Sequence, residues 1–186
     1  VEELSKELLK SSWKVDSLNK KPITQNPYPP FTTSTLQQEG IRKLRLSSQQ
    51  VMMVAQKLYE NGHITYMRTD SMNLSNEALN AARSEIKLLY GNSYLPKDAR
   101  RYKSRAKNTQ EAHEAIRPAG SKFKHPDTLK NSLTDQEFKL YNIIWKRTVA
   151  SQMKSAKLEQ TTIQISDGKY IFETKGKIII TFYLLF

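Results

Sequence analysis

The segment 62–71 carries a phenol, a guanidinium and a carboxylate at intervals of two residues. These groups belong to Tyr66, Arg68 and Asp70. If the segment is a short strand, all three side chains share one face, because residues two apart in an extended chain point the same way. A phenol needs help to act as a nucleophile, since its ordinary pKa is about 10. A cation on the same face favours the phenolate and stabilises the charge that builds on a phosphate under attack.

Two interpretations of this triplet are open when the segment is taken alone. In the first, Tyr66 is a nucleophile and Arg68 is the cation that assists it. In the second, Tyr66 is a structural residue, because tyrosine side chains are commonly half-buried with only the hydroxyl at the surface. Other parts of the chain have to decide between catalysis and structure.

A second unusual segment spans residues 111–118. His113 and Arg117 are four residues apart, so one helical turn would place both on one face. Because Arg117 precedes Pro118, which disfavours helix at the residue before it, we expect a turn that ends there. The pair His113-Glu114 begins like the zinc motif H-E-x-x-H, but the fifth position is arginine, and the other two histidines lack ligand spacing. The sequence therefore predicts no metal site within this chain.

The charge balance favours a polyanionic partner. The chain has 186 residues, with 30 Lys and Arg against 18 Asp and Glu, which gives a net charge of +12 and a pI of about 9.8. Such an excess indicates nucleic acid before membrane, although a lysine-rich soluble surface would have the same composition. Residues 99–107 hold five cations and one tyrosine, which suits either a phosphate-contacting loop or a solvated one.

Several features that the sequence lacks indicate which cellular compartment it suits. The chain has no cysteine, so it can form no disulfide and has no thiolate chemistry, as is usual in a reducing compartment. Its amino-terminal residues do not resemble a signal peptide, and the apolar run 178–186 is too short to span a bilayer. We expect a cytoplasmic protein without a membrane segment.

The first part of the chain predicts a helix over 2–9, a half-buried strand over 13–18 and then a proline-rich connector. Asn26-Pro27-Tyr28-Pro29-Pro30 places three prolines in four positions, so it fits neither a helix nor a central strand. We place a domain boundary there. A ligand for a proline-reading module is the alternative, but helix-start signals follow at once.

Capping residues and apolar periodicity predict four helices, and alternation predicts strands after them. One helix is expected to begin among the hydroxyl residues 32–35 and run to about residue 44, and the next covers 49–61 with Ser47 or Ser48 as its cap. Two more are expected over 75–90 and, from a capping box that begins at Thr134, to about residue 153. Asp167-Gly168 predicts a hairpin turn between strands, Lys175-Gly176-Lys177 a second turn, and 178–183 a further strand. The order helix, turn, helix, short strand is that of a winged-helix unit, so we expect a mixed α and β chain with a mainly helical, winged-helix or CAP-like domain.

Three windows, in this order and spacing, resemble one family. They are residues 29–39 (Pro-Pro-Phe-Thr-Thr-Ser-Thr-Leu-Gln-Gln-Glu), 62–71 (Gly-His-Ile-Thr-Tyr-Met-Arg-Thr-Asp-Ser) and 111–118 (Glu-Ala-His-Glu-Ala-Ile-Arg-Pro). Together they resemble the type IA DNA topoisomerases, the family of bacterial DNA topoisomerase I, over about residues 13–175. The resemblance implies that residues 26–153 form the helical domain with the active-site tyrosine. Residues 1–25 and 154–186 would be strands of a neighbouring hinge domain.

The family's chemistry implies a role for each site residue. Tyr66 would cut one strand of DNA, single-stranded at the cleavage site, and become linked to the 5′ phosphate until the break is resealed. By resemblance, Arg68, His113 and Arg117 would contact DNA, and Arg68 and His113 would act at the scissile phosphate. Thr65 and Asp70 would orient the site. Exchanging a phosphodiester for a phosphotyrosine ester conserves bond energy, and the chain has no G-x-x-x-x-G-K-[ST] loop, so no ATP is expected.

The resemblance also indicates what is missing. The family binds Mg²⁺ through an acidic D-x-D cluster, and this chain contains no D-x-D, so the metal ligands are expected elsewhere in a longer, cytoplasmic and nucleoid-associated bacterial isomerase. The chain by itself is then expected to be inactive. The alternative is a non-catalytic, winged-helix DNA-binding module.

Overall fold

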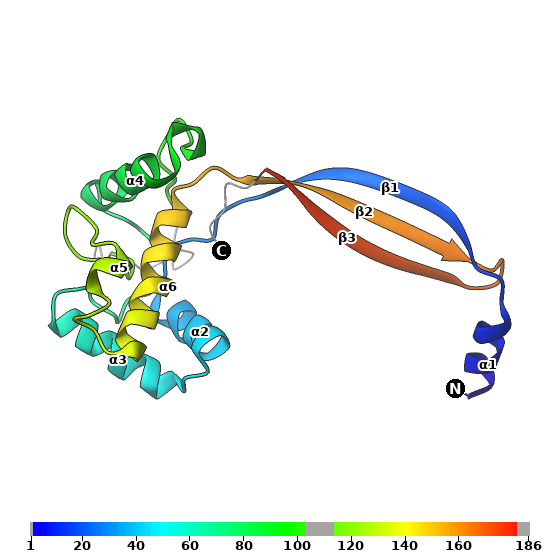
Figure 1. Cartoon of the computed structure of the whole chain (residues 1–186), viewed down its shortest axis with the longest axis horizontal. Coiled ribbons are helices and arrows are strands. Elements are labelled where there is room, and N and C mark those ends of the chain that lie inside the picture. Colours follow the sequence, from blue (N-terminus) through cyan, green and yellow to red (C-terminus); the bar gives the residue numbers. More distant parts are fainter. Residues whose placement is uncertain (1, 103–113, 182–186) are drawn as a thin grey trace. The chain divides into compact units, whose positions relative to one another are not determined.

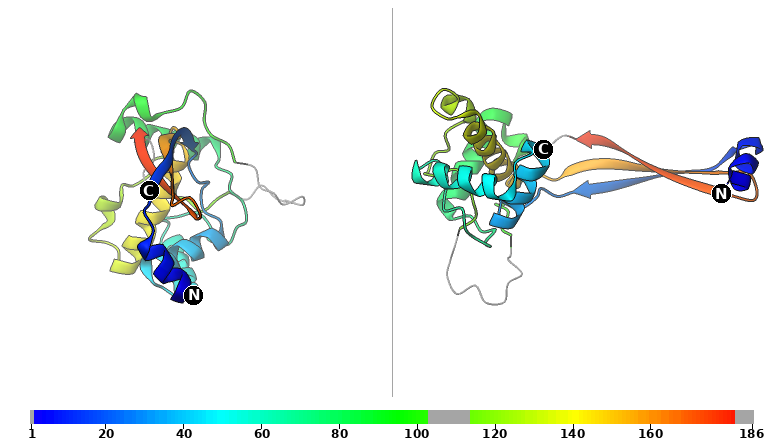
Figure 2. Two further views of the ribbon diagram at one scale, coloured as in Figure 1. Left: turned by 90° about the vertical axis from the view of Figure 1, so that its right-hand side faces the viewer. Right: turned by 90° about the horizontal axis from the view of Figure 1, so that it is seen from below.

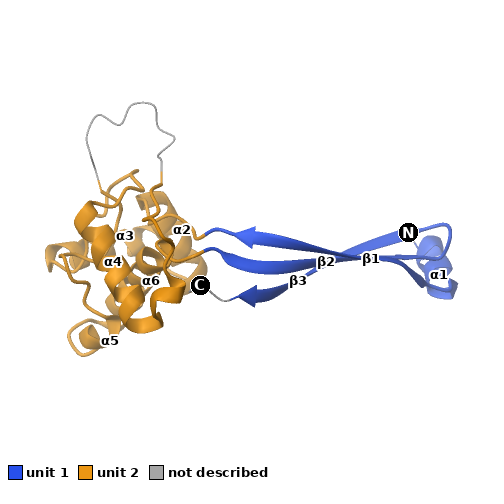
Figure 3. Cartoon of the chain, turned by 90° about the horizontal axis from the view of Figure 1, so that it is seen from above, with its two compact units in different colours: residues 1–26, 155–182 blue, residues 27–154, 183–186 orange. Residues whose placement is uncertain are grey.

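The computed structural model describes residues 2–102 and 114–181, which divide into two compact units. Of these residues, unit 1 is made from 2–26 and 155–181, and unit 2 from 27–102 and 114–154 (Figure 3). The chain therefore leaves unit 1 after Asn26 and returns to it at Ser155. The hinge and gate roles that the resemblance implies for these segments stay predictions.

Unit 1 is a helix followed by a three-stranded antiparallel sheet (Figure 1). Its elements are α1 (Glu2–Lys10), β1 (Lys14–Gln25), β2 (Ala156–Ser166) and β3 (Ile171–Thr181). The strand order is β1-β2-β3, so β2 is central, and Figure 2 shows the long strands twisting about one another. Most residues of β1 and β3 are exposed, so the sheet has little core of its own.

Two predictions about these strands are wrong. The segment around Pro22 was expected to belong to the connector, yet β1 continues through it, with Pro22 opposite Glu159. Proline is tolerated there because β1 is an edge strand, whose outer side needs no ladder hydrogen bonds. Residues 175–177 do not turn either. Gly176 lies opposite Thr161 within a continuous β3, because β2 offers pairing partners along the whole length.

Unit 2 contains the hydrophobic core and most of the helices. Its elements are α2 (Thr33–Leu44), α3 (Ser48–Glu60), α4 (Asn76–Tyr90), η1 (Asn92–Tyr94), α5 (Pro126–Leu129) and α6 (Asp135–Ser151). Helix α6 contacts α2, α3, α4 and α5, so it forms the centre of the unit (Figure 1). Its inner face buries Tyr141, Ile144, Trp145 and Val149.

Local capping signals explain where these helices begin. Thr32, Ser47 and Thr134 each accept a hydrogen bond from the backbone three residues on, and each is part of a capping box. Ser75 caps α4 in the same way without the reciprocal bond. Gly62, just after α3, has φ of 69°, which is favourable for glycine and ends the helix at the start of the segment with Tyr66.

The predicted mixture of α and β structure is confirmed, with the strands gathered in unit 1. Within the residues that the structure describes, no helix is both long and apolar enough to cross a bilayer.

Close packing between α2 and α3 gives a first prediction. A Cβ on buried Gly40 would lie 2.5 Å from Cγ2 of Val51, whose branched side chain is short and stiff. Gly40→Ala should therefore lower the free energy of unfolding by about 1 kcal/mol or more, because overpacking outweighs the better helix propensity of alanine. Urea unfolding of the purified chain measures the change.

The matched test shortens the Val51 side chain that the new Cβ would meet. In a Val51→Ala background the same Gly40→Ala change should cost nothing or stabilise, since the Cβ then has room. An equal cost in both backgrounds would show that the contact with Val51 is not the cause.

Candidate active site

Residues 64–70 alternate between surface and core, but the segment 62–71 contains a turn and several bends and is not a regular strand. Tyr66 is 47% exposed, Met67 is 5% exposed, and Arg68 and Asp70 lie at the surface. Among the described residues, its one β-type pairing is an isolated bridge between Ile64 and Pro118. The predicted strand is therefore wrong, although the predicted alternation of faces is present.

Thr33, the first residue of α2, holds the carboxyl-terminal half of this segment. Its hydroxyl accepts a hydrogen bond from the backbone N–H of Thr69 at 2.8 Å and donates to the carbonyl of Met67, also at 2.8 Å. Its own backbone N–H donates to the carbonyl of Thr69 at 2.9 Å. One residue thus binds backbone groups on both sides of Arg68 and leaves that side chain pointing outward.

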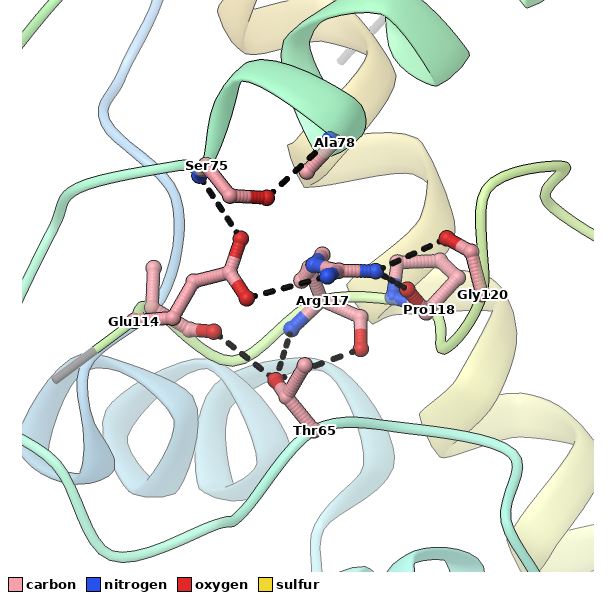
Figure 4. A network of polar contacts seen from close by, with 8 residues as sticks. Thr65, Ser75, Ala78, Glu114, Arg117, Pro118 and Gly120 are labelled. Atoms are coloured by element: carbon pink, nitrogen blue, oxygen red, sulfur yellow. Dashed lines mark hydrogen bonds and ion pairs between the residues drawn. The ribbon is translucent and has the colours of Figure 1, made fainter.

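Thr65 holds the amino-terminal half against residues 115–117 (Figure 4). Its hydroxyl donates to the carbonyl of Ala115 at 2.8 Å and accepts from the N–H of Arg117 at 3.0 Å. The backbone N–H of Thr65 donates to the carbonyl of Arg117 at 2.9 Å. The residue next to Tyr66 is therefore tied to the end of the third window by three hydrogen bonds.

Backbone bonds also join the first and third windows. The N–H of Ile116 donates to the carbonyl of Phe31 at 2.9 Å, and the N–H of Ala115 donates to the carbonyl of Asn73 at 2.8 Å. The three windows, far apart in sequence, thus meet at one place in unit 2. His113 lies outside the described residues, two positions before the first of these bonded groups.

Arg117 is buried rather than presented to solvent. It is 7% exposed, and its guanidinium donates to the carbonyls of Pro118 at 2.9 Å and Gly120 at 3.0 Å (Figure 4). The third partner is the carboxylate of Glu114, also at 2.9 Å. These contacts favour a positioning role for Arg117 over the DNA contact that the sequence predicted, because both terminal nitrogens of the guanidinium already have partners inside the protein, and only its buried Nε has none among the described residues.

Glu114 connects this arginine to the start of α4. Its second oxygen accepts from the backbone N–H of Ser75, the residue that caps the helix, at 2.8 Å. Desolvation acts to raise the pKa of the Glu114 carboxyl, but hydrogen bonds and charge from Arg117, together with the Ser75 N–H, outweigh it and hold the pKa below its ordinary value. The carboxylate is therefore ionised at neutral pH and bonded on both oxygens.

A hollow of about 500 Å³ lies beside the exposed face of the segment. It is lined by Thr32, Thr33, Ser34, Arg68, Thr69 and Asp70. The start of α2 contributes three of these residues, and a helix start carries partial positive charge on its backbone N–H groups. The Arg68 guanidinium is also in the lining, so these groups suit a phosphate, and Asp70 supplies the one carboxylate among the lining residues.

Tyr66 itself is accessible and close to a second phenol. Its ring packs edge-on against that of Tyr59, with centroids 5.2 Å apart. Tyr59 is also exposed, at the end of α3. Two surface tyrosines therefore lie side by side, and only one belongs to the segment held by Thr33 and Thr65.

The described ranges, 2–102 and 114–181, contain no group of three or more His, Asp or Glu that could hold a metal ion. The described residues of this site therefore do not fit a bound metal by themselves.

Sequence reasoning missed two of the residues that hold this site together, Thr33 and Glu114. Thr33 was interpreted only as one of several capping hydroxyls, although the run of four hydroxyl residues at 32–35 exceeds what one cap needs. Glu114 was considered as part of a metal motif, whereas its spacing of three from Arg117 is that of an ion pair on one turn.

Comparison with known proteins decides the family. The protein family described as DNA topoisomerase matches residues 1–182. The chain belongs to the bacterial DNA topoisomerase I family. It is 51% identical over 176 residues to DNA topoisomerase 1 of Synechococcus elongatus, and this match covers 95% of this chain and 20% of that protein. It is 53% identical over 170 residues to DNA topoisomerase 1 of Streptomyces coelicolor, covering 89% and 18%.

The fold agrees with a solved member of the topoisomerase family. Full-length topoisomerase I from Thermotoga maritima matches 96% of this chain and 30% of its own length, with a TM-score of 0.78 and 37% identity. The chain spans about a fifth of the length of these curated topoisomerase relatives. The predicted family is therefore confirmed.

The contacts of Thr33 give a second prediction. Thr33→Val keeps the shape of the side chain but removes the acceptor of the Thr69 N–H and the donor to Met67. The free energy of unfolding should fall by about 1–3 kcal/mol, because part-buried backbone groups lose their partner. Amide hydrogen exchange at Thr69 should accelerate by more than this global loss explains, since the segment opens locally.

Thr33→Ser is the matched control, because it keeps the hydroxyl. It should preserve slow exchange at Thr69. Equal exchange rates at Thr69 in the serine and valine variants would mean that the hydroxyl does not hold the segment.

The lowered pKa of Glu114 gives a third prediction. A group whose pKa is lower in the folded state stabilises the protein above its unfolded value, about 4.5, and this contribution disappears as the pH falls through the folded value. Glu114→Gln should lower the free energy of unfolding by about 1–2 kcal/mol at pH 7. The difference from the unchanged chain should shrink below about pH 4.5.

Urea unfolding at pH 7, 5, 4 and 3 measures this difference. Glu60→Gln, at an exposed position at the end of α3, controls for simply removing one negative charge. A Glu114→Gln difference that stays constant down to pH 3 would contradict the ionised pair with Arg117.

Proposed function

We propose that this chain supplies the nucleophile of a type IA DNA topoisomerase, and that the nucleophile is Tyr66. The observation that carries the proposal is an exposed Tyr66 beside an exposed Arg68, on a segment whose backbone is held at both ends by threonine hydroxyls. Membership of the family supports the reaction class, since the relatives that match this chain are named topoisomerases.

In the proposed reaction the phenolic oxygen of Tyr66 attacks a backbone phosphorus of single-stranded DNA. A bond forms between that oxygen and phosphorus, the bond to the 3′ oxygen breaks, and the proton lost by the phenol is balanced by one gained at the 3′ hydroxyl. The 5′ phosphate stays on the tyrosine while another strand passes, and the reverse attack reseals the break. One phosphate ester replaces another, so no ATP is consumed.

The other site residues divide into two roles. Arg68 and His113 are proposed to contact the phosphate, where a guanidinium stabilises charge on the non-bridging oxygens. Thr65, Arg117 and Asp70 are proposed as positioning residues. Arg117 is given this role because its guanidinium is already bonded to two carbonyls and to Glu114.

The residues that the structure describes, 2–102 and 114–181, form no metal site, so no step above is assigned to a metal. We propose that the Mg²⁺ of the complete enzyme is held by residues other than those described, and that the enzyme acts on bacterial DNA in the cytoplasm. A non-catalytic DNA-binding module is the alternative function, and family membership does not favour it.

The fourth prediction tests the nucleophile in a complete enzyme. In a chimaera, these 186 residues replace the matching segment of the Synechococcus elongatus relative. With an oligonucleotide labelled at its 3′ end, denaturing gels should show the label covalently attached to protein. Tyr66→Phe should abolish this adduct and change the dissociation constant for single-stranded DNA by less than about twofold, because only the reacting oxygen is removed.

Tyr59→Phe is the matched control, since it removes the neighbouring exposed hydroxyl and keeps the ring contact. It should leave the adduct intact. An adduct that survives Tyr66→Phe, or one that carries a 5′ label instead, would refute the assignment. The 186-residue chain alone should not relax supercoiled DNA.

A further inference from the structure

A second cavity in unit 2, of about 180 Å³, lies between α2 and α6. It is lined by Phe31, Glu39, Lys43, Leu44, Lys139, Asn142, Ile143, Lys146 and Arg147. None of these residues lines the hollow beside Arg68. Four cationic side chains and a single carboxylate therefore face this space.

The one carboxylate is shared among several cations. Glu39 pairs with Arg42 at 2.8 Å, with Lys43 at 3.0 Å and with Arg147 at 3.6 Å. Desolvation acts to raise the pKa of Glu39, but bonds and charges from Arg42 and Lys43 outweigh it, so the pKa is lowered and the group stays ionised. The cluster keeps a net positive charge even with this carboxylate ionised.

Arg147 is the most constrained of these cations. Its side chain is 16% exposed, and its guanidinium lies 4.3 Å from the ring centroid of Phe31 and 5.1 Å from that of Tyr28. Among the described residues, it pairs with Glu39 but donates no hydrogen bond. Aromatic rings thus hold the planar group in place while its donors stay available for an anion, a geometry that suits phosphate.

An exposed aromatic ring stands next to this cation. Tyr28 is 61% exposed and lies between Pro27 and Pro29, whose rings restrict the backbone on either side of it. Proteins that bind single strands commonly pair a cationic groove with such a ring, on which an unpaired base stacks.

We propose that this cavity binds single-stranded DNA, with a backbone phosphate held by Arg147, Lys43 and Lys146 and an adjacent base stacked on Tyr28. The proposal rests on the proposed function only in taking DNA as the partner. It adds a contact for the strand that is separate from the reacting phosphate at Tyr66. Duplex DNA fits less well, because its bases are already stacked and cannot cover the tyrosine ring.

The first test measures how binding of a fluorescent oligothymidine to the 186-residue chain depends on salt. Lys43→Gln with Lys146→Gln removes two proposed phosphate contacts. The slope of log affinity against log salt should become shallower by about 1.4, since each contact with a single strand contributes about 0.7. At 0.1 M salt the dissociation constant should rise about tenfold.

The control pair is Lys87→Gln with Lys130→Gln, which removes the same charge from exposed positions outside the cavity. Its slope should match that of the unchanged chain. Equal slopes for the two pairs would overturn the site, because binding would then follow total charge alone. No binding of oligothymidine by the unchanged chain would overturn it as well.

The second test concerns the base. Tyr28→Ala should weaken oligothymidine binding about tenfold, while Tyr28→Phe should not, since stacking needs only the ring. Binding of a duplex of equal length should be unaffected by either change. A Tyr28→Ala variant that binds oligothymidine normally, or an unchanged chain that prefers the duplex, would overturn the proposal. The Tyr66 adduct in the chimaera decides the proposed function separately, whatever these slopes show.

Discussion

Two threonine hydroxyls determine the shape of the candidate active site. Thr33 and Thr65 bind backbone groups rather than side chains, so each fixes the path of the chain on one side of Tyr66 and Arg68. An irregular segment has no partner strand to order it, and ordering each residue costs about 1–2 kcal/mol of conformational entropy. Hydrogen bonds from side chains to the backbone offset that cost and leave the side chains of Tyr66 and Arg68 exposed.

The same framework explains why two nearby arginines behave differently. Arg117 lies inside, where two carbonyls and Glu114 use its donors, and it holds the third window in place. Arg68 lies at the surface beside a hollow that includes the start of α2. A guanidinium is always charged and binds in a fixed planar geometry. Buried Arg117 can therefore position the chain, while exposed Arg68 is available to an anion.

Much of this arrangement was predictable, and the exceptions have one cause. The cap at Thr134 and the turn at Asp167-Gly168 depend on neighbours within three residues, so local rules predicted them correctly, and the same rules narrowed the cap of α3 to Ser47 or Ser48. Pro22 was misjudged because its tolerance depends on which strand lies at the sheet edge. The role of Thr33 depends on a segment 36 residues away, and no pattern in one sequence reports such a distance.

Helix α2 takes part in both candidate contacts with DNA. Its first residue, Thr33, holds the segment with Tyr66, while Glu39 and Lys43 on the same helix belong to the basic cavity. The carbonyl of Phe31, just before the helix, accepts a hydrogen bond from the N–H of Ile116. The guanidinium of Arg147 lies over the ring of the same residue. A short helix is stiff, so α2 keeps a constant spacing between the segment with Tyr66 and the basic cavity. No conformational change within the helix is needed to relate the two. A strand bound in the cavity would therefore meet Tyr66 in a defined register.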